Sequence, residues 1–356
     1  MVYKNGNPLQ QYVWAQIPKL KTIPSESLET MFEDFSPDDL VRNSQLSADE
    51  LTNTFCLSYI TESLTEQYSA TFHEGARKYD AKWLSDYITG FWEPDEKGHA
   101  DPFRNVLTDF GIDRRKLDDE VQEAKEQTNY SSKHGSGLHP ISLTTYGLIQ
   151  ECITDYWYEL QRSFFPSTSN TSKAISLVKG REALHTVQFK TLTAMQIEQD
   201  PLLLELIIDT IKNFQMPANH IPTISHIEHQ TQNWIPHMNG SVYELLKRIL
   251  GKIYDALQDT SLFGRILLEY ASESEQRILN LFPNKFTSRA ISSMRGGPGF
   301  VGELILESLG ILSNEMEAPK TNFETMQYKL KQIIKRWIAD QLRLEEFLGP
   351  ASTVKL

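Results

Sequence analysis

Two adjacent stretches of the chain are predicted to form long helices, and they limit the possible folds more than any other feature. Residues 141–165 and 171–199 keep a helical spacing of apolar side chains and contain no internal proline. With a rise of about 1.5 Å per residue, either stretch could cross a domain as a single helix. Together they predict a helical bundle at the centre of the fold.

Helical periodicity also dominates the rest of the chain. Residues 51–72 are a candidate long helix, residues 114–128 a charged, solvated helix, and residues 200–214 a helix with Pro201 in its first turn. Several helical segments follow between residues 240 and 347. We find no repeat period, and we predict an all-α fold.

The pattern divides the chain into three regions. Residues 1–50 are an amino-terminal extension in which residues 23–35 and 46–51 are predicted to be short capped helices. Residues 51–221 form the bundle. Residues 222–356 form a carboxy-terminal helical region that packs on the bundle.

Composition excludes several classes of protein. With 356 residues, 40% of them hydrophobic, the chain can bury a sizeable core without disulfides. Cys56 and Cys152 are the only cysteines, which favours a reducing compartment. An iron–sulfur cluster or a zinc ribbon needs about four thiolates, so both are excluded, and electrons for redox chemistry would come from outside the chain.

Charge and hydropathy exclude two kinds of partner. The net charge is −12 and the basic residues are scattered, whereas nucleic-acid binding needs a basic face. The longest apolar run, residues 202–211, is interrupted by Glu205 and Asp209, so we expect no membrane span. The amino terminus lacks the apolar segment of a secretory signal, and a cytoplasmic location is expected.

Two Glu-x-x-His motifs are present, at Glu96/His99 and at Glu182/His185. On a helix this spacing places both side chains on one face. Because about 0.7 such motifs would occur by chance in a chain of this composition, the two motifs alone are weak evidence. The residues that precede the two motifs strengthen this evidence.

A long predicted helix with an isolated glutamate precedes each motif: Glu62 before the first and Glu151 before the second. The order Glu, Glu-x-x-His, Glu, Glu-x-x-His is the ligand set of ferritin-like di-iron bundles. The predicted metal ligands are Glu62, Glu96, His99, Glu151, Glu182 and His185. The alternative is that they are solvated helix-face charges and core histidines, which explains any one pair but explains the ordered set of six less well.

The residue types suit a pair of iron ions. Four carboxylates neutralise two divalent irons and can bridge them, while one imidazole for each iron leaves positions open for O₂. Glu66 is an alternative to Glu62, because it also follows a threonine and lies one turn further along the same predicted helix. We favour Glu62.

A longer pattern surrounds the six ligands, over about residues 55–221. Its members are Thr61 and Tyr68 on either side of Glu62, Trp92 four residues before Glu96, Gln150 and Thr154 on either side of Glu151, and an apolar helix ending in Met216-Pro217-Ala218. This pattern resembles the soluble acyl-carrier-protein desaturases. The resemblance does not extend to the carboxy-terminal third.

The resemblance implies an O₂-dependent di-iron desaturase of fatty acid metabolism that acts on an acyl chain held by an acyl carrier protein. A ferredoxin-like donor would reduce the irons. The oligomeric state is left open, with a homodimer as one candidate. The family also implies that Thr154 and Thr61 lie on the O₂ side of the irons, where a hydroxyl can donate a hydrogen bond or a proton. A narrow apolar tunnel near Thr154, with a basic mouth, is expected for the acyl chain.

Two features depart from the family pattern. Arg181 stands where the family has an aspartate before the last Glu-x-x-His glutamate, so an orienting carboxylate is missing or comes from elsewhere, with Asp155 as the candidate. The stretch 91–103 contains Gly98 and two prolines. We nevertheless predict that it is helical, and that Pro94 and Pro102 kink the helix or that Pro94 lies in its first turn.

Other motifs receive simpler interpretations. His226 and His229 are predicted to lie in a polar loop, and the glycine-rich residues 294–302 in an interhelical turn. The basic residues near 329–336, or Arg289 and Arg295, are candidates for the docking of an acidic carrier protein.

Two alternatives to desaturation stay open. The first is a di-iron oxygenase that hydroxylates or N-oxygenates another substrate. The second is a non-catalytic ferritin-like iron protein, although storage subunits are about half as long as this chain.

Overall fold

A computed structural model describes residues 8–20, 33–128, 137–224 and 231–257. These residues form helices and no strand, which confirms the predicted all-α class. The α-helices are α1 (Pro8–Gln16), α3 (Pro37–Leu40), α4 (Ala48–Glu62), α5 (Thr65–Lys78), α6 (Lys82–Tyr87), α7 (Glu93–Glu96), α8 (Asp101–Asp109), α9 (Arg114–Gln127), α10 (Pro140–Arg162), α11 (Asn170–Gln199), α12 (Leu204–Lys212), α14 (Thr231–His237) and α15 (Val242–Leu257).

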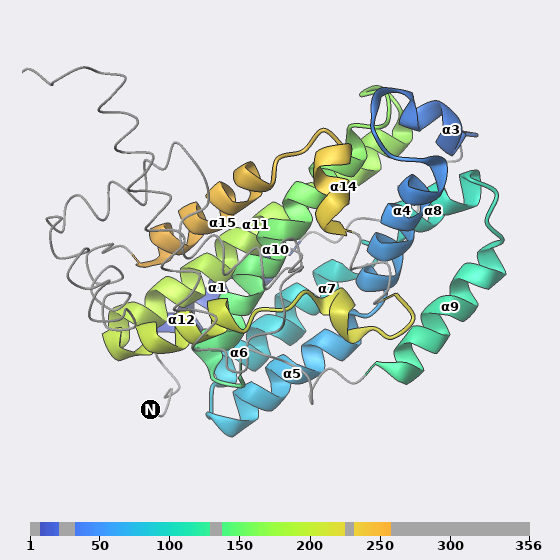
Figure 1. The fold of residues 1–356 in the computed structure, drawn as a ribbon. Coiled ribbons are helices and arrows are strands. Elements are labelled where there is room, and N and C mark those ends of the chain that lie inside the picture. The colour runs from blue at the N-terminus through green and yellow to red at the C-terminus, as the bar shows by residue number, and fades with distance from the viewer. Residues whose placement is uncertain (1–7, 21–32, 129–136, 225–230, 258–356) are drawn as a thin grey trace, which may run out of the picture.

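The two predicted long helices, α10 and α11, lie side by side at the centre of the fold (Figure 1). They approach closely where Gly147 of α10 meets Phe189 of α11, because a Cβ atom on Gly147 would lie 2.8 Å from the Phe189 ring. Phe189 in turn packs against Phe72 and Trp92 from the other side of the bundle. The core is therefore continuous from α5 to α11.

The segment predicted as one helix over residues 51–72 is broken. α4 ends at Glu62 and α5 begins at Thr65, and Leu64 between them leaves helical geometry. The Tyr68 hydroxyl donates a hydrogen bond of 3.1 Å to the Thr61 carbonyl across the break. The same carbonyl also accepts from the Leu64 N–H at 3.2 Å, so both bonds link the two sides of the break.

The start of α4 also differs from the prediction of a separate short helix at residues 46–51. Ser47 and Glu50 form a capping box, in which each side chain accepts from the other residue's backbone N–H. The predicted cap is present, but it begins the 15-residue helix α4. The predicted helix at residues 23–35 lies largely outside the described residues.

The stretch 91–103 is helical only in part. α6 continues through a π-helical turn, Ile88–Trp92, in which the Glu93 N–H bonds to the Ile88 carbonyl, and then into α7, where Pro94 lies in the first turn. Chain direction changes at Gly98, whose φ of 92° favours glycine, and α8 begins at Asp101. The prediction of one helix through this stretch is therefore wrong.

Helices α9, α12 and α15 cover the bundle. α9 buries Leu117, Val121 and Ala124 along one face, so the predicted charged helix is solvated only on its other faces. Residues 200–214 form a short 3₁₀ turn, Pro201–Leu203, followed by α12. α15 packs against α10 and α11, while the division of the chain into three regions stays a prediction.

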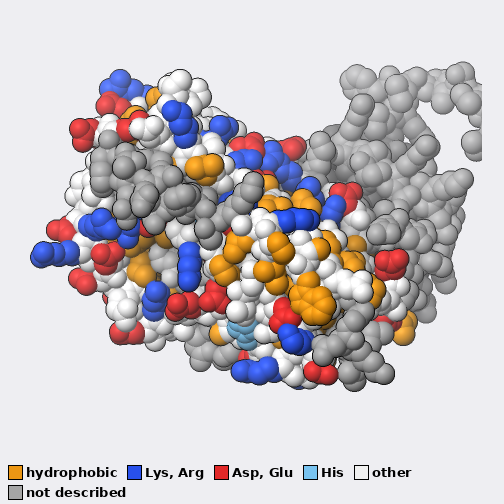
Figure 2. Space-filling view, turned by 180° about the vertical axis from the view of Figure 1, so that it is seen from behind, with side chains coloured by type: hydrophobic (Ala, Val, Ile, Leu, Met, Phe, Trp, Pro, Cys, Tyr) orange, Lys and Arg blue, Asp and Glu red, His pale blue; other side chains and the backbone are white. Residues whose placement is uncertain are grey.

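The surface carries some exposed apolar side chains among the described residues, namely Trp14, Leu177, Val187 and Leu202. Figure 2 shows hydrophobic side chains gathered on one face, with acidic and basic side chains around them. No described helix is long and apolar enough to span a bilayer. The expectation of a homodimer stays a prediction.

Candidate metal centre

The six predicted ligands lie together in the core of the bundle. They form two overlapping groups in which one potential ligand atom of each residue lies within 4.8 Å of the others. We call Glu62, Glu96, His99 and Glu182 the Glu62 half, and Glu96, Glu151, Glu182 and His185 the Glu151 half. Glu96 and Glu182 belong to both halves, and each half therefore offers carboxylate oxygens and one imidazole.

Each imidazole directs its Nδ1 atom toward the carboxylates. His99 Nδ1 lies 2.9 Å from Glu96 Oε2 and 2.8 Å from Glu182 Oε1. His185 Nδ1 lies 2.9 Å from Glu96 Oε1 and 3.6 Å from Glu151 Oε2. The shared carboxylates thus lie between the two histidines.

Several of these buried atoms make no hydrogen bond despite their proximity. They are Glu96 Oε1, Glu182 Oε1, His99 Nδ1 and His185 Nδ1. These atoms face one another as close charge contacts, His99 Nδ1 with Glu182 Oε1 and His185 Nδ1 with Glu96 Oε1. All four atoms are of the types that coordinate metals. A cation among them would satisfy every one, so the cluster could bind a metal ion.

The pKa values of the cluster reflect its crowding. Burial, reinforced by the neighbouring carboxylates, raises the pKa of both Glu62 and Glu182 well above the ordinary value. Burial alone would lower the pKa of His99 and His185, but Glu96 and its neighbouring acids outweigh it and raise both. Without a cation, protons therefore compensate the carboxylate charge.

Asp95 orients His185. Its Oδ2 atom lies 2.8 Å from His185 Nε2, and Arg181 holds the same carboxylate through Nε at 2.7 Å and Nη2 at 2.5 Å. Burial would raise the pKa of Asp95, but the contacts with His185 and Arg181 lower it. Asp95 thus stays a carboxylate that fixes Nε2 as the protonated nitrogen and leaves Nδ1 free for a metal.

The predicted role of Asp155 is wrong. Asp155 pairs with Lys179 at 2.9 Å and does not contact either histidine in the described structure. The orienting carboxylate comes instead from Asp95, and Arg181 pairs with that carboxylate. The sequence signal for Asp95 was its position directly before Glu96, the glutamate of the first Glu-x-x-His motif.

His99 is held differently. It lies in the turn after Gly98, where its backbone N–H bonds to the Glu96 carbonyl at 3.1 Å. Its Nε2 atom is buried and has no partner. Within the described part of the chain, no carboxylate equivalent to Asp95 therefore fixes this imidazole.

Aromatic side chains hold two of the glutamates. Trp92 Nε1 donates to Glu151 Oε1 at 2.9 Å, which gives a structural role to the tryptophan of the sequence pattern. Tyr158 donates its hydroxyl hydrogen to Glu62 Oε1. Sequence reasoning missed Tyr158, although it lies two helical turns after Glu151 on the same face of α10.

The two threonines lie at the cluster. Thr154 Oγ1 donates to Glu182 Oε2 at 3.1 Å. Thr61 Oγ1 is buried and has no hydrogen-bond partner. Their roles toward O₂ stay predictions, since these positions show only that both hydroxyls lie on ligand-bearing helices.

Glu66 lies outside both groups. It is exposed on α5, beyond the helix break, whereas Glu62 is only 9% exposed and lies with the other ligands. The structure thus places Glu62, rather than Glu66, in the cluster. His226, His229, residues 294–302, Arg289, Arg295 and residues 329–336 lie outside the described residues.

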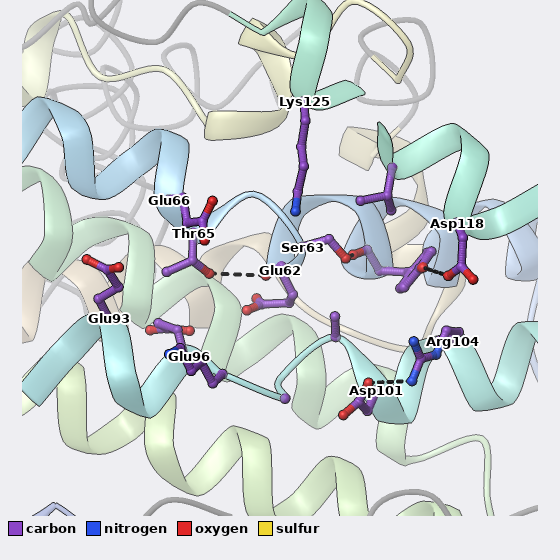
Figure 3. A pocket seen from close by; sticks show the side chains of 15 residues that line it. Glu62, Ser63, Thr65, Glu66, Glu93, Glu96, Asp101, Arg104, Asp118 and Lys125 are labelled. Carbon is purple, nitrogen blue, oxygen red and sulfur yellow. Dashed lines mark hydrogen bonds and ion pairs between the residues drawn. The ribbon is translucent and has the colours of Figure 1, made fainter. Parts of the chain in front are cut away.

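A cavity of about 350 Å³ opens beside the Glu62 half (Figure 3). Glu62 and Glu96 line it, and most of its other lining residues are charged or polar, among them Glu66, Arg104 and Lys125. It differs from the apolar tunnel expected near Thr154, and Thr154 does not line it.

Comparison with known proteins adds no relative. No protein-family model matches the chain, and neither the curated proteins nor the solved structures yield a match.

Proposed function

We propose that this protein is an O₂-dependent di-iron oxidase, with one iron in the Glu62 half and one in the Glu151 half. The observation that carries the proposal is the set of buried carboxylate and imidazole atoms that converge without hydrogen bonds among themselves. Four carboxylates and two imidazoles are the ligand set of ferritin-like di-iron proteins. An external electron donor would reduce the pair of irons, and the reduced irons would supply oxidation chemistry with O₂ as the oxidant.

The protein's own residues would prepare this centre. Asp95 and Arg181 hold His185 in one tautomer, and Trp92 fixes Glu151, so these ligands need little rearrangement on binding. Thr154 holds a proton on Oγ1 next to Glu182, where it could be passed to an oxygen atom of the substrate. Burial of Glu151, Glu182 and His185 shields the Glu151 half from bulk water.

For the reaction, we propose desaturation of an acyl chain carried by an acyl carrier protein, with a ferredoxin-like electron donor in a cytoplasmic setting. The support is the resemblance in sequence: the tryptophan before Glu96, the threonine after Glu151 and the Met216-Pro217-Ala218 end of the apolar helix. Trp92 and Thr154 contact the ligands Glu151 and Glu182, as residues of a metal-site pattern should.

The cavity favours a second candidate, a di-iron oxygenase with a small polar substrate. A saturated acyl chain gains free energy by burial against apolar walls, whereas this cavity presents carboxylates, Arg104 and Lys125. The two candidates share the metal chemistry and differ only in the substrate.

Metal counting tests the proposal. Protein loaded with ferrous iron under anaerobic conditions should bind two irons per chain, and zinc should not compete equally. A single iron per chain would contradict the di-iron assignment.

Mass spectrometry of products then separates the reactions. Acyl carrier proteins incubated with the loaded, reduced protein and O₂ should lose two hydrogen atoms if the protein is a desaturase. Gain of an oxygen atom would favour the oxygenase, and no change in any acyl chain would remove the carrier-protein substrate.

A further inference from the structure

The cavity beside the Glu62 half has walls from three parts of the fold. α4 and α5 contribute Tyr59 and Glu66, the chain from α7 to α8 contributes Glu93 and Arg104, and α9 contributes Lys125 (Figure 3). A volume of about 350 Å³ is within the range of small-molecule sites. Any occupant would lie next to the candidate metal centre.

Two opposite charges in this cavity have no partner. Lys125 extends from α9 into the cavity, is half-buried, and makes no ion pair with any described residue (Figure 3). The Glu66 carboxylate, on α5, likewise makes no ion pair or hydrogen bond within the described part of the chain. They line the same cavity without pairing with each other.

The remaining charged residues of the cavity wall outside the cluster have a polar neighbour or are exposed. Arg104 pairs with Asp101 at 2.7 Å, Asp118 accepts from the Tyr59 hydroxyl at 3.2 Å, and Glu93 lies 3.9 Å from His73. Lys97 is exposed. Glu66 is exposed as well, and Lys97 lies in a turn, whereas Lys125 is half-buried. The unpaired ammonium and carboxylate that helices carry into the cavity are therefore those of Lys125 on α9 and Glu66 on α5.

We infer that this cavity binds a small zwitterion, with the ligand carboxylate on Lys125 and the ligand ammonium on Glu66. A neutral apolar chain would leave both charges without a partner, and a simple anion or cation would satisfy only one of them. The oxidation of such a ligand rests on the proposed function, in its oxygenase form. Binding of the ligand does not depend on the metal.

Direct binding tests the inference on the full-length, metal-free protein. The probes are ω-amino acids from glycine to ε-aminocaproate, with hexanoate and hexylamine as matched single-charge compounds. Saturation-transfer NMR and calorimetry should show that at least one zwitterion binds about tenfold more tightly than either single-charge compound, since each compound lacks one charged contact. Equal binding of all probes, or preference for a single-charge compound, would overturn the inference.

Variants locate the two contacts. Lys125→Met and Glu66→Gln should each weaken zwitterion binding about tenfold. Lys116→Met is the matched control, because Lys116 is exposed on the same helix and lies 3.8 Å from Glu120, and it should leave binding unchanged. The double variant Glu66→Lys/Lys125→Glu should restore binding, because a zwitterion can enter in the reverse direction.

The outcomes separate this inference from the proposed function. If the single variants bind the zwitterion as the unmodified protein does, the inference is wrong while the iron stoichiometry is unaffected. If the protein fails to bind two irons but binds the zwitterion with the expected variant effects, the di-iron proposal is wrong and the ligand site stands.

Discussion

In the Glu151 half of the candidate centre, both unshared ligands project from uninterrupted helices, whereas in the Glu62 half both lie beside a break. Glu151 and His185 occupy the middle of α10 and α11. Glu62 is the last residue of α4, and His99 lies in the turn between α7 and α8. The two halves thus contain the same residue types, but continuous helices carry them in the Glu151 half and helix breaks carry them in the Glu62 half.

The two histidines also differ in their hydrogen bonds. His185 has Asp95 on its Nε2 atom, but the Nε2 atom of His99 has no partner. The cavity also opens at the Glu62 half. We conclude that the Glu151 half is the preorganised one, which should bind metal more tightly, and that the Glu62 half is the one a ligand can reach.

The largest expected effect comes from removing a carboxylate that both halves share. Glu182→Ala should abolish binding of both irons, because Glu182 belongs to each group. Iron per chain, measured by elemental analysis, should fall from two to near zero. Retention of one tightly bound iron would show that Glu182 serves only one half.

The next largest loss of bound iron should be confined to one half of the centre. Glu62→Gln should remove the weaker iron and leave about one per chain, since the Glu151 half does not include Glu62. Glu66→Gln is the control, because Glu66 lies outside both groups and should leave two irons in place. The opposite ranking of the two variants would move the ligand to α5.

Asp95→Asn should weaken metal binding in the Glu151 half without removing any of its predicted ligands. Loss of an orienting partner of a metal-bound histidine typically lowers affinity about 10- to 100-fold. Cobalt competition with a chelator measures this, and Asp101→Asn, which removes the partner of Arg104, is the control. An equal loss of affinity in both variants would mean that Asp95 acts only through stability.

The pH dependence of the metal-free protein should follow the raised pKa values of Glu62, Glu182, His99 and His185. A group whose pKa is raised by folding holds its proton in the folded state at pH values where the unfolded chain has lost it. Stability should therefore fall as pH rises above the ordinary glutamate pKa of 4.5, and more steeply above the ordinary histidine pKa of 6.5. Each such proton contributes about 1.4 kcal/mol per pH unit.

Thermal unfolding of chelator-treated protein between pH 6.5 and higher pH tests this expectation. Glu62→Gln should show a shallower fall, because its side chain stays neutral at every pH. The lowered pKa values of Glu96 and Asp95 affect stability only at acidic pH, so they do not change the pH dependence of stability above pH 6.5. A melting temperature that rises with pH would contradict the assigned directions.

The smallest effect concerns the backbone of the turn that carries His99. Gly98→Ala should destabilise the protein by about 1 kcal/mol, because Gly98 has a φ of 92°. Gly180→Ala is the matched comparison: Gly180 lies inside α11 with open space around it, so alanine there should stabilise by about 0.5–1 kcal/mol. Chemical denaturation measures both, and equal effects would mean that the turn is not strained by a side chain.

The sequence by itself determined the all-α class and the extent of the main helices. The stretch predicted at residues 171–199 is observed as Asn170–Gln199, and the stretch at 141–165 as Pro140–Arg162. These predictions succeed because periodicity, caps and proline positions act within a few residues. The six residues predicted as ligands also come together in two buried groups that could hold a metal ion, while their role as ligands stays a prediction.

The breaks in the helices were not predicted correctly. Residues 51–72 contain no glycine or proline to mark the break after Glu62, and the Tyr68 hydrogen bond that stabilises it forms only once the chain has turned. At Gly98 the local signal for a turn was present, but the spacing of Glu96 and His99 suggested a helix.

Only the tertiary structure decided which carboxylate orients His185. The resemblance in sequence left the orienting carboxylate open at Arg181, with Asp155 as the candidate. In the fold, Asp95 reaches His185 from a helix 90 residues away in sequence, and Arg181 pairs with that same carboxylate. Because a hydrogen-bond partner can come from any element within reach, its identity is a property of packing and not of sequence distance.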